Sequence, residues 1–169
     1  MQPTIRRIQL SDAESFRTCL DSVARERKFL AQIEAPPLEK VHGFVAQSVE
    51  QDAAQYVAIV GERIVGWCDV FAHWAYALKH VGTLGMGVHV EFRRQGLGRA
   101  LLLQTLQHAL KNEIYRVTLE AREDNTRAIR LYEQVGFKHE GRAACALRFD
   151  GQFYTGVTMA LLQGPASVA

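Results

Sequence analysis

A basic, Gly-rich turn lies between an apolar, β-prone run and an apolar run with helical spacing, and this turn restricts the fold more than any other feature. The first run is Met86 to Val90, and the second begins at Leu101. A helix that starts where a strand ends presents unpaired amide groups and a partial positive charge at that point. We therefore expect a mixed α/β fold with an anion-binding site at this turn.

The residues of the turn suit a pyrophosphate. Gly96 and Gly98 allow the backbone to approach a ligand closely because they carry no Cβ atom. Full positive charge comes from Arg93, Arg94 and Arg99. The Walker pattern is absent, and the dinucleotide pattern fails because Leu101 stands where the third glycine belongs. The alternative is an ordinary strand-to-helix turn with exposed arginines.

Composition is that of an ordinary globular protein. Of the 169 residues, 48% are hydrophobic and 22% are charged, and the formal net charge of +2 is too small to favour nucleic acid as a partner. The N-terminus lacks the apolar segment of a signal peptide, and no apolar run reaches the ~20 residues of a membrane span. We expect one domain over residues 1–162, a flexible tail over 163–169, a cytoplasmic location and no membrane partner.

The cysteines indicate a reducing compartment. Cys19, Cys68 and Cys145 are odd in number and far apart, and no CxxC motif is present. Such cysteines are typical of reduced, buried thiols in a cytosolic protein. No metal site is expected from them.

Periodicity and turn residues predict the order β-α-α-β-β-β-α-β-α-β-β. A capping box at Ser11–Glu14 predicts that the first helix starts near Asp12, and Asn125 and Gly136 are expected to cap and end the last helix. The expected strands cover residues 4–9, 56–60, 64–74, 83–90, 116–121, 138–147 and 154–161, and the expected helices cover 12–28, 38–51, 96–111 and 125–136.

Two segments together resemble the GCN5-related N-acetyltransferase (GNAT) superfamily. The first is Arg-x-x-Gly-x-Gly at Arg93, Gly96 and Gly98, which resembles the pyrophosphate loop for acetyl-CoA. The second is L-E-A-R-E-D-N-T-R-A-I-R-L-Y-E-Q-V-G-F, which ends at Phe137. The resemblance covers about residues 83–162. It implies the GNAT fold, a mixed central β-sheet with splayed central strands flanked by about four helices, and acetyl-CoA as cosubstrate with no metal.

The resemblance also implies a set of acetyl-CoA contacts. The amide N–H near Val88 would polarise the thioester carbonyl, as an oxyanion hole does. Asn125 would reach a pantetheine amide, although the same side chain could be a plain helix cap. The residues expected to contact acetyl-CoA are Val88, Val90, Arg93, Arg94, Gln95, Gly96, Leu97, Gly98, Arg99, Ala100, Asn125, Ala128 and Tyr132.

Two catalytic residues follow from the same resemblance. Tyr132 would protonate the departing thiolate, or else it is a core tyrosine on the apolar stripe of its helix. Glu120 would be the base that deprotonates the acceptor, as in the ribosomal-protein alanine N-acetyltransferases of the superfamily. Its alternative is a solvated charge on an edge strand, paired with Arg122.

The acceptor is less well defined by the sequence. The ending at residues 142–154 is similar to small-molecule N-acetyltransferases that act on amino acids or phosphinothricin-type antibiotics, so we expect direct transfer to a small primary amine. Candidate acceptor residues are Glu34, Trp74 and Tyr154. Glu34 could equally be a surface charge, and the aromatic residues near Trp74 could be core or a dimer face.

Three alternatives remain open at this stage. The acceptor could be a protein N-terminus or a lysine. The chain could also be a regulatory module that binds acetyl-CoA without turnover, although such a module would not need Tyr132. The C-terminal strands, with Phe149, Phe153 and Tyr154, could pair in a homodimer because exposed sheet edges tend to be covered.

Overall fold

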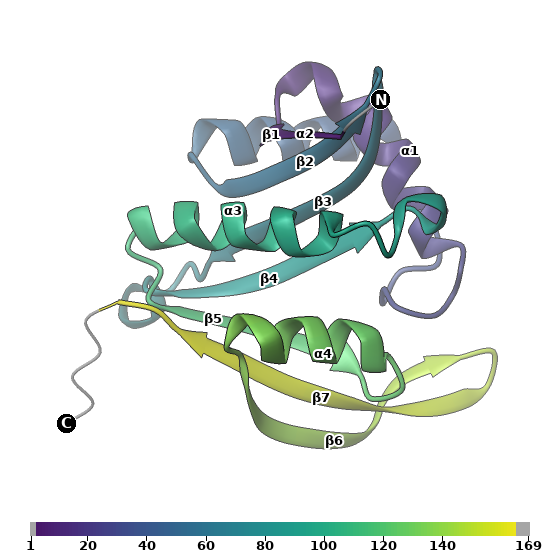
Figure 1. Ribbon diagram of the computed structural model, residues 1–169, viewed down its shortest axis with the longest axis vertical. Coiled ribbons are helices and arrows are strands. Elements are labelled where there is room, and N and C mark those ends of the chain that lie inside the picture. The colour runs from purple at the N-terminus through teal and green to yellow at the C-terminus, as the bar shows by residue number, and fades with distance from the viewer. Residues whose placement is uncertain (1–2, 165–169) are drawn as a thin grey trace.

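The structure is a computed structural model that describes residues 3–164, and it contains a seven-stranded sheet with helices on both faces (Figure 1). The predicted order of elements is confirmed. The strands are β1 (Thr4–Arg7), β2 (Ala54–Val60), β3 (Arg63–Ala72), β4 (Val81–Val88), β5 (Arg116–Arg122), β6 (Lys138–Phe149) and β7 (Gln152–Leu162). The helices are α1 (Ala13–Ala24), α2 (Leu38–Glu50), α3 (Leu97–Lys111) and α4 (Thr126–Val135).

The sheet changes character at its centre. Its strand order is β1-β2-β3-β4-β5-β7-β6, and every neighbouring pair is antiparallel except β4 and β5. A parallel pair needs a crossover connection, and α3 provides it after the Gly-rich turn. The expected hairpins β2–β3 and β6–β7 are both present.

The parallel strands separate soon after they meet. Pairing between β4 and β5 covers only Val81–Thr83 with Arg116–Thr118, and the two strands then diverge (Figure 1). Beyond these residues each strand still pairs with its outer neighbour, β3 or β7. The splayed central strands that the GNAT resemblance implied are therefore confirmed.

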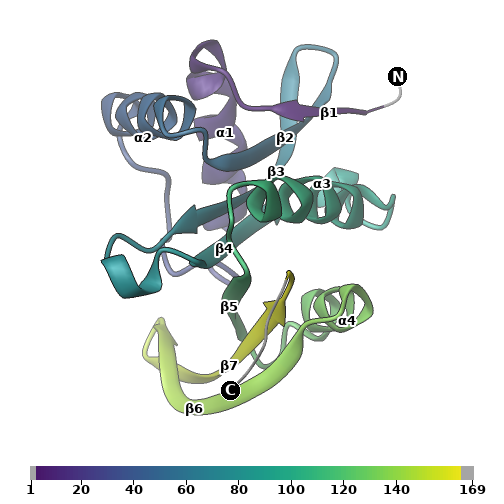
Figure 2. The ribbon, with the colours of Figure 1, turned by 90° about the vertical axis from the view of Figure 1, so that its left-hand side faces the viewer.

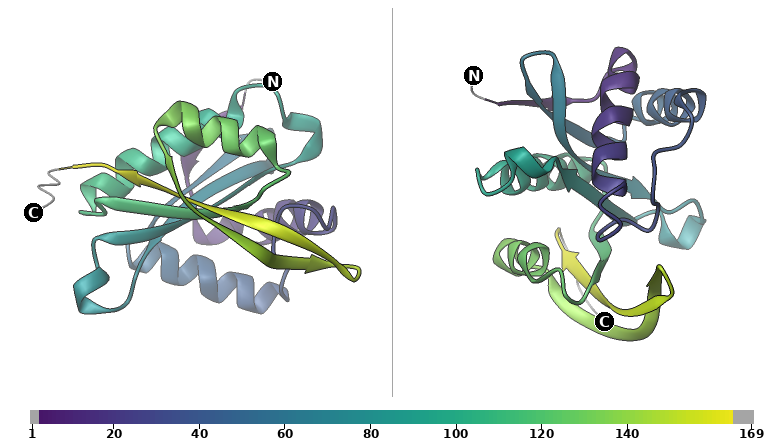
Figure 3. Two further views of the ribbon diagram at one scale, coloured as in Figure 1. Left: turned by 90° about the horizontal axis from the view of Figure 1, so that it is seen from below. Right: turned by 90° about the vertical axis from the view of Figure 1, so that its right-hand side faces the viewer.

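Two helices cover each face of the sheet (Figures 2 and 3). On the face of α1 and α2, Phe16 of α1 packs edge-on against Trp67, with ring centroids 5.8 Å apart. On the opposite face, Leu101 and Leu102 of α3 and Tyr132 of α4 join the larger core cluster. Since successive side chains of a strand alternate in direction, each strand contributes to both layers.

Two expectations from the sequence are wrong in detail. Asp12, not Ser11 with Glu14, makes the cap at the start of the first helical segment: its Oδ2 atom accepts from the Gln9 amide at 2.8 Å. Cys145 is exposed, at a bulge of β6 where its φ is +56°.

Gln163, the first residue of the predicted tail, is hydrogen-bonded to the rest of the fold. Gln163 donates from its side-chain amide to the carbonyl oxygens of Leu106 and Ile114, at 3.2 and 3.1 Å, and from its backbone to Tyr115 at 2.8 Å. These bonds tie it to the end of α3 and the start of β5. Residues 165–169 of the predicted tail lie outside the described residues.

Gly87 illustrates how tightly the α1 face is packed. A Cβ atom at Gly87 would lie 2.3 Å from Cη2 of Trp67. We expect Gly87→Ala to destabilise the protein by roughly 1–3 kcal/mol because the buried ring has no room to move. Gly43→Ala is the control: no atom lies within 4 Å of its added methyl group on α2, so a gain of roughly 0.5–1 kcal/mol is expected. Urea denaturation measures both, and equal stabilities would contradict the packing argument.

Candidate active site

The Gly-rich turn forms an uncapped helix start. Gly96 is the N-cap of α3 with a left-handed φ of +80°, and no side chain caps the helix. The first backbone bond of the helix runs from the Ala100 amide to the Gly96 carbonyl, at 3.1 Å. The amides of Leu97, Gly98 and Arg99 therefore remain free of helical partners, as an anion site requires.

Two of the three arginines of the turn remain available to a ligand. Arg94 and Arg99 are exposed, and Arg94 takes a left-handed φ of +64°. No atom lies within 4 Å of a Cβ built at Gly96, so the backbone there can be approached closely. The expected phosphate-binding residues Arg94, Gln95, Gly96, Leu97, Gly98, Arg99 and Ala100 are thus contiguous at the start of α3.

Arg93 is placed differently from expectation. Its guanidinium forms a bidentate pair with Glu26, which follows α1, and its Nε donates to the carbonyl of Val88 at 2.8 Å. The same group lies 5.5 Å from the ring centre of Phe29. With these partners Arg93 links the α1–α2 loop to the end of β4, and its charge is already neutralised by a carboxylate.

The divergence of β4 and β5 exposes backbone groups of β4. The amide of His89 donates to Val65 of β3 at 2.8 Å, and amides alternate in direction along a strand. The Val88 amide therefore points away from β3, toward the space left by β5. Val90, expected on the strand, lies beyond it in a 3₁₀ turn at Val90–Phe92 and is 59% exposed.

The start of α4 supplies the second half of the site. Asn125 is its N-cap, and its Oδ1 accepts from the Ala128 amide at 3.4 Å. The oxygen caps the helix while the amide NH₂ has no partner among residues 3–164. Both expected roles of Asn125 are thus compatible, because they use different atoms.

Tyr132 is almost fully buried and still has a free hydroxyl group. The residue is 7% exposed and packs against Phe137, with ring centroids 5.7 Å apart. Burial raises its pKa above the ordinary value, with a smaller contribution from the nearby Cys68 thiol. Within the described residues the Tyr132 hydroxyl has no hydrogen-bond partner, and its oxygen is not fully enclosed.

Glu120 lies on the face of the sheet that α1 and α2 cover, and its side chain is exposed. The strand β5 is central, between β4 and β7, so the alternative of an edge-strand charge is wrong. Pairing with Arg122 is also wrong, because Arg122 holds both oxygens of Asp124 at 2.6 Å. Tyr154, a predicted acceptor residue, stacks on the Arg122 guanidinium at 3.9 Å on this face.

The carboxyl group of Glu120 leans toward β7. A Cβ atom at Gly156 would lie 2.6 Å from its Oε1 and 2.9 Å from the Cβ of Ala146. Gly156 therefore leaves the space that the carboxyl group occupies. This direction takes the charge away from β4, whose free amides line the divergence.

Glu34 and Trp74 are not brought into this group. Glu34 is exposed in the α1–α2 loop, where its carboxylate lies 3.6 Å from the Arg25 guanidinium. Trp74 is 87% exposed in the β3–β4 connection. That connection joins the start of β4, at the opposite end from the Gly-rich turn, so Trp74 cannot wall the same site.

Sequence reasoning missed a carboxyl group in the middle of β3. Asp69 is 9% exposed, on the same face as Glu120, and burial raises its pKa to about 7 with a partial offset from the Gly85 backbone. No ion pair involves it among residues 3–164. Its signal in the sequence is a lone acid inside the apolar run from Ile64 to Ala72.

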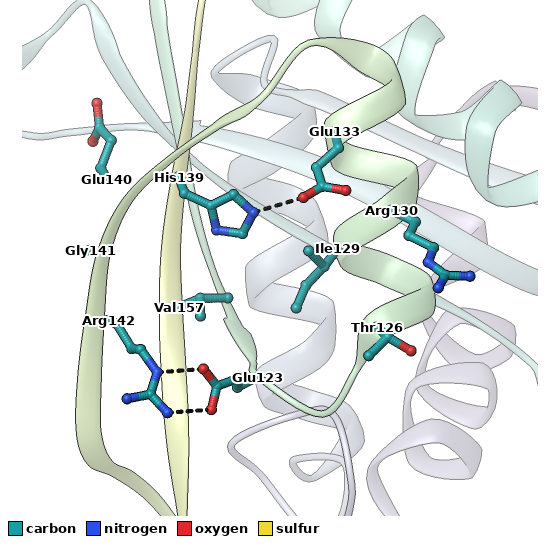
Figure 4. A pocket seen from close by; sticks show the side chains of 10 residues that line it. All are labelled: Glu123, Thr126, Ile129, Arg130, Glu133, His139, Glu140, Gly141, Arg142 and Val157. Carbon is teal, nitrogen blue, oxygen red and sulfur yellow. Dashed lines mark hydrogen bonds and ion pairs between the residues drawn. The ribbon is translucent and has the colours of Figure 1, made fainter.

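A separate pocket of about 590 Å³ lies between α4 and β6 (Figure 4). Ion pairs between Glu123 and Arg142 and between Glu133 and His139 line it. Neither Glu120 nor Tyr132 contributes to its walls. It is therefore distinct from the residues that the sequence motifs bring together.

Comparison with known families agrees with this geometry. The family model described as Acetyltransferase (GNAT) family matches residues 18–137. This chain belongs to the GNAT acetyltransferase family. The match spans α1 to the end of α4 and so includes the uncapped helix start, the divergence of β4 and β5, and Tyr132.

Two relatives of this GNAT acetyltransferase are named as N-acetyltransferases. An N-alpha-acetyltransferase of Sulfurisphaera tokodaii is 39% identical over 106 residues, which cover 56% of this chain and 62% of the relative. The [ribosomal protein bS18]-alanine N-acetyltransferase of Escherichia coli is 37% identical over 72 residues, covering 43% of this chain and 49% of the relative. The chain thus spans less than two thirds of either relative.

A solved structure shares the whole fold. The phosphinothricin acetyltransferase of Sinorhizobium meliloti, solved in complex with acetyl-CoA, superposes with a TM-score of 0.91. The match covers 99% of this chain and 91% of that one, at 15% sequence identity. At this identity the comparison establishes the fold.

The described residues fit acetyl-CoA, the cosubstrate of the family. The free amides of α3 suit a pyrophosphate, and the backbone groups of β4 that face the divergence suit an extended amide-containing chain. Within residues 3–164 no group of three His, Cys, Asp or Glu side chains is arranged to hold a metal ion. No helix in that range is long and apolar enough to cross a membrane.

Gly96→Glu tests the pyrophosphate site. A carboxylate at this position repels phosphate, so we expect the affinity for acetyl-CoA to fall at least ~10-fold, about 1.4 kcal/mol. Gly61→Glu is the matched control, since Gly61 also has a left-handed φ, of +64°, and open space, but lies in the β2–β3 turn. Calorimetric titration measures both variants. An unchanged dissociation constant in folded Gly96→Glu would rule out the assignment of this loop.

Asp69→Asn tests the burial of a lone acid. Because the pKa of Asp69 is raised from 3.8 to about 7 on folding, the native state binds its proton more tightly than the unfolded chain. The free energy of unfolding of the wild type therefore falls as pH rises from about 4 to about 7, because the ionised form of Asp69 is unfavourable in the folded state. Asn cannot ionise and removes this cost. The stability of Asp69→Asn relative to wild type should therefore increase by roughly 1–3 kcal/mol when the pH is raised from about 5 to about 8.

Denaturant unfolding at the two pH values measures this difference. Glu120→Gln, an exposed carboxyl group on the same face, is the control and should show little differential gain. A parallel pH dependence of wild type and Asp69→Asn would contradict the burial of a titrating acid at this position.

Proposed function

We propose that this acetyl-CoA-dependent N-acetyltransferase acts on a small primary amine, such as an amino acid, by direct transfer in a ternary complex. The observation that carries the proposal is a bridge across the acceptor face, defined here as the sheet face with Glu120 and Tyr154 that α1 and α2 cover. A bridged face admits a small amine more readily than a folded protein.

Two consecutive residues after α1 make this bridge. Glu26 pairs with Arg93 beyond the end of β4, and Arg27 pairs with Asp150 in the β6–β7 turn, where one N–O distance is 2.5 Å. The α1–α2 loop is thereby tied to both sides of the divergence between β4 and β5. In the ribbon the loop and the β6–β7 turn lie at the same end of the molecule (Figures 1 and 3).

The bridge is unequal in strength. Glu26 and Arg93 are largely buried, with side chains 23% and 19% exposed, whereas Arg27 and Asp150 are 43% and 70% exposed. Exposed ion pairs are worth at most about 1 kcal/mol. The Arg27–Asp150 contact therefore narrows the acceptor face and can open at little cost.

Each expected catalytic group has a defined task in this proposal. Acetyl-CoA supplies an activated acetyl group as a thioester. The Val88 amide would donate to the oxygen that gains negative charge, and Tyr132 would give its proton to the departing sulfur. The phenol is protonated at neutral pH, and burial raises its pKa further, so a proton is available for the departing sulfur.

The acceptor face also carries negative charge that attracts a protonated amine. Glu120 remains the sequence-based prediction for the base, and Asp69 is a second carboxyl group on the same face. Tyr154 and Arg122 border this region on the β7 side. Glu34 lies on the exposed α1–α2 loop. In this proposal it lies on the path of the entering amine and does not bind it in the site.

Direct transfer is supported by the state of the cysteines. Burial raises the pKa of both Cys19 and Cys68, to about 12 for Cys19, so neither thiol ionises at neutral pH. The exposed Cys145 lies on the outer strand β6. A covalent acetyl-cysteine step has no activated thiol to use, since the thiolate is the nucleophile.

The second candidate acceptor is a protein N-terminus. The names of two relatives favour it, since the Sulfurisphaera tokodaii protein is an N-alpha-acetyltransferase and the Escherichia coli protein a [ribosomal protein bS18]-alanine N-acetyltransferase. An extended peptide would need the Arg27–Asp150 contact to open. A purely regulatory acetyl-CoA-binding module is disfavoured because Tyr132 keeps a free hydroxyl on the core face.

An acceptor screen separates the candidates. Acetyl-CoA consumption is measured with free amino acids, polyamines, aminoglycosides and short peptides, for wild type and for Asp150→Ala. We expect the highest kcat/KM with a small amine, and a gain for peptides in Asp150→Ala. Wild type that prefers peptides by more than ~10-fold would overturn the small-amine proposal in favour of N-terminal acetylation.

Tyr132→Phe tests the general acid. The substitution keeps the ring and its contact with Phe137, so stability should change by no more than ~1 kcal/mol. We expect turnover to fall ~10²-fold, the usual effect of removing a general acid, with acetyl-CoA affinity within a few-fold. Steady-state kinetics and calorimetry measure the two quantities. Tyr76→Phe, exposed in the β3–β4 connection, should leave both unchanged, and undiminished turnover in Tyr132→Phe would return Tyr132 to a packing role.

The cytoplasmic location and the homodimer expected from the sequence remain predictions. Phe153 is 56% exposed near the β6–β7 turn, and β6 is the outer strand of the sheet. These features are compatible with a contact through the C-terminal strands.

A further inference from the structure

Asp69 occupies a row of residues that crosses the sheet on the acceptor face. Strand pairing places Gln55 of β2 opposite Asp69 of β3, and Asp69 opposite Gly85 of β4. Two residues before Gly85, Thr83 makes the last pair with β5, so Gly85 and Glu120 stand at the same level on either side of the divergence. The row therefore contains two carboxyl groups, one on each side of the space between β4 and β5.

The two helices leave Asp69 one direction in which to extend. On one side of it along β3, Trp67 packs against Phe16 of α1, and on the other side Phe71 packs against Phe44 of α2 with ring centroids 5.0 Å apart. Toward β4 the neighbour is a glycine. A Cβ atom at Gly85 would lie 2.9 Å from Oδ1 of Asp69, which shows that the carboxyl group extends over the Gly85 backbone.

The carboxyl group is hydrogen-bonded to the Gly85 backbone, but no cation within residues 3–164 neutralises its charge. Among the described residues no Lys, Arg or His pairs with Asp69, whereas Glu26 and Asp124 are each paired with an arginine. Next to it, the side-chain amide of Gln55 is fully buried and has no hydrogen-bond partner. Buried carboxylates are normally paired with a cation, so a buried acid without one, beside an unpaired amide, marks a position where a cationic ligand completes the site.

Asp69 and Glu120 differ in direction. Glu120 leans over Gly156 of β7, away from β4, whereas Asp69 leans over Gly85 of β4 toward the strand whose amides face the divergence. The Val88 amide, on the same strand, lies three residues farther along. Asp69 is therefore the carboxyl group that reaches toward the β4 side, where the family places the acetyl group.

We propose that Asp69 is a catalytic residue that binds the ammonium group of the acceptor and takes its proton. The inference rests on the proposed N-acetyltransferase function and adds to it the identity of the proton acceptor. It assigns Glu120 to attraction of the cation and Asp69 to its deprotonation. The acceptor class that this site requires is a primary amine that is protonated in solution.

Asp69 and Tyr132 together account for every proton that moves in this step. The Asp69 carboxylate takes one proton from R–NH₃⁺, which leaves R–NH₂ with a free electron pair. As the nitrogen–acetyl bond forms and the carbon–sulfur bond breaks, Tyr132 gives a proton to the sulfur, and the second proton of the nitrogen replaces it. Asp69 then releases its proton to solvent, so one proton is produced for each acetyl group transferred.

Nucleophiles that differ in charge test the role of Asp69. Wild type, Asp69→Asn and Glu120→Gln are assayed at neutral pH with the best amine of the acceptor screen, which is an ammonium ion, and with methoxyamine, which is already neutral. A proton acceptor is needed only for the ammonium ion. We expect Asp69→Asn to lose ~10²-fold or more in kcat with the ammonium acceptor but no more than ~5-fold with methoxyamine.

Acetyl-CoA titration and thermal unfolding of each variant verify that the fold and the cosubstrate site persist. Asp69→Ser replaces Asp69→Asn if the latter does not fold. Equal losses with both nucleophiles would mean that Asp69 only shapes the site, and an ammonium-selective loss in Glu120→Gln alone would assign the base to Glu120. Either result overturns the proposal for Asp69. Wild type that binds acetyl-CoA but acetylates no amine would instead overturn the proposed function.

Discussion

The early separation of β4 from β5 is the constraint on which the rest of this structure depends. A strand that loses its neighbour exposes amide and carbonyl groups that must find other partners, because unpaired backbone groups in a protein interior are costly. Here Arg93 takes the carbonyl of Val88, and the adjacent amide is left for a ligand. The same divergence makes room for α3 to begin at the end of β4, with its own amides directed to one side. Binding groups from a strand and from a helix are thus brought together by a single irregularity.

Both layers of helices are adapted to this irregularity. On the α3 and α4 face, the start of α3 packs near Met86 and Leu131, with which a Cβ at Gly98 would make ordinary contacts at 3.5 Å. On the opposite face, glycines 85 and 87 of β4 are covered by side chains that reach over from β3. Side chains at these two positions would clash with Asp69 and Trp67, so the glycines of β4 determine where these two side chains lie on the acceptor face.

Much of the fold and half of the site could be predicted from sequence because the signals are local. The uncapped glycine turn, the Asn125 cap and the left-handed Gly136 each depend on a few neighbouring residues. The roles of Arg93, Trp74 and Asp69 could not be predicted in the same way. Arg93 forms an ion pair with Glu26, 67 residues away in the sequence. Asp69 is buried because α1 and α2 pack over β3 on either side of it. Long-range packing decides which charged groups stay free, and no local pattern records that outcome.

The adjacency of Glu26 and Arg27 has a thermodynamic consequence. One residue holds the segment that carries the Gly-rich turn, and the next holds the β6–β7 turn beside the acceptor face. A displacement at one anchor would have only one peptide bond over which to relax before it reaches the other. If a ligand on one side shifts this loop, the two ligands must alter each other's affinity by the same factor, because coupling free energies are reciprocal.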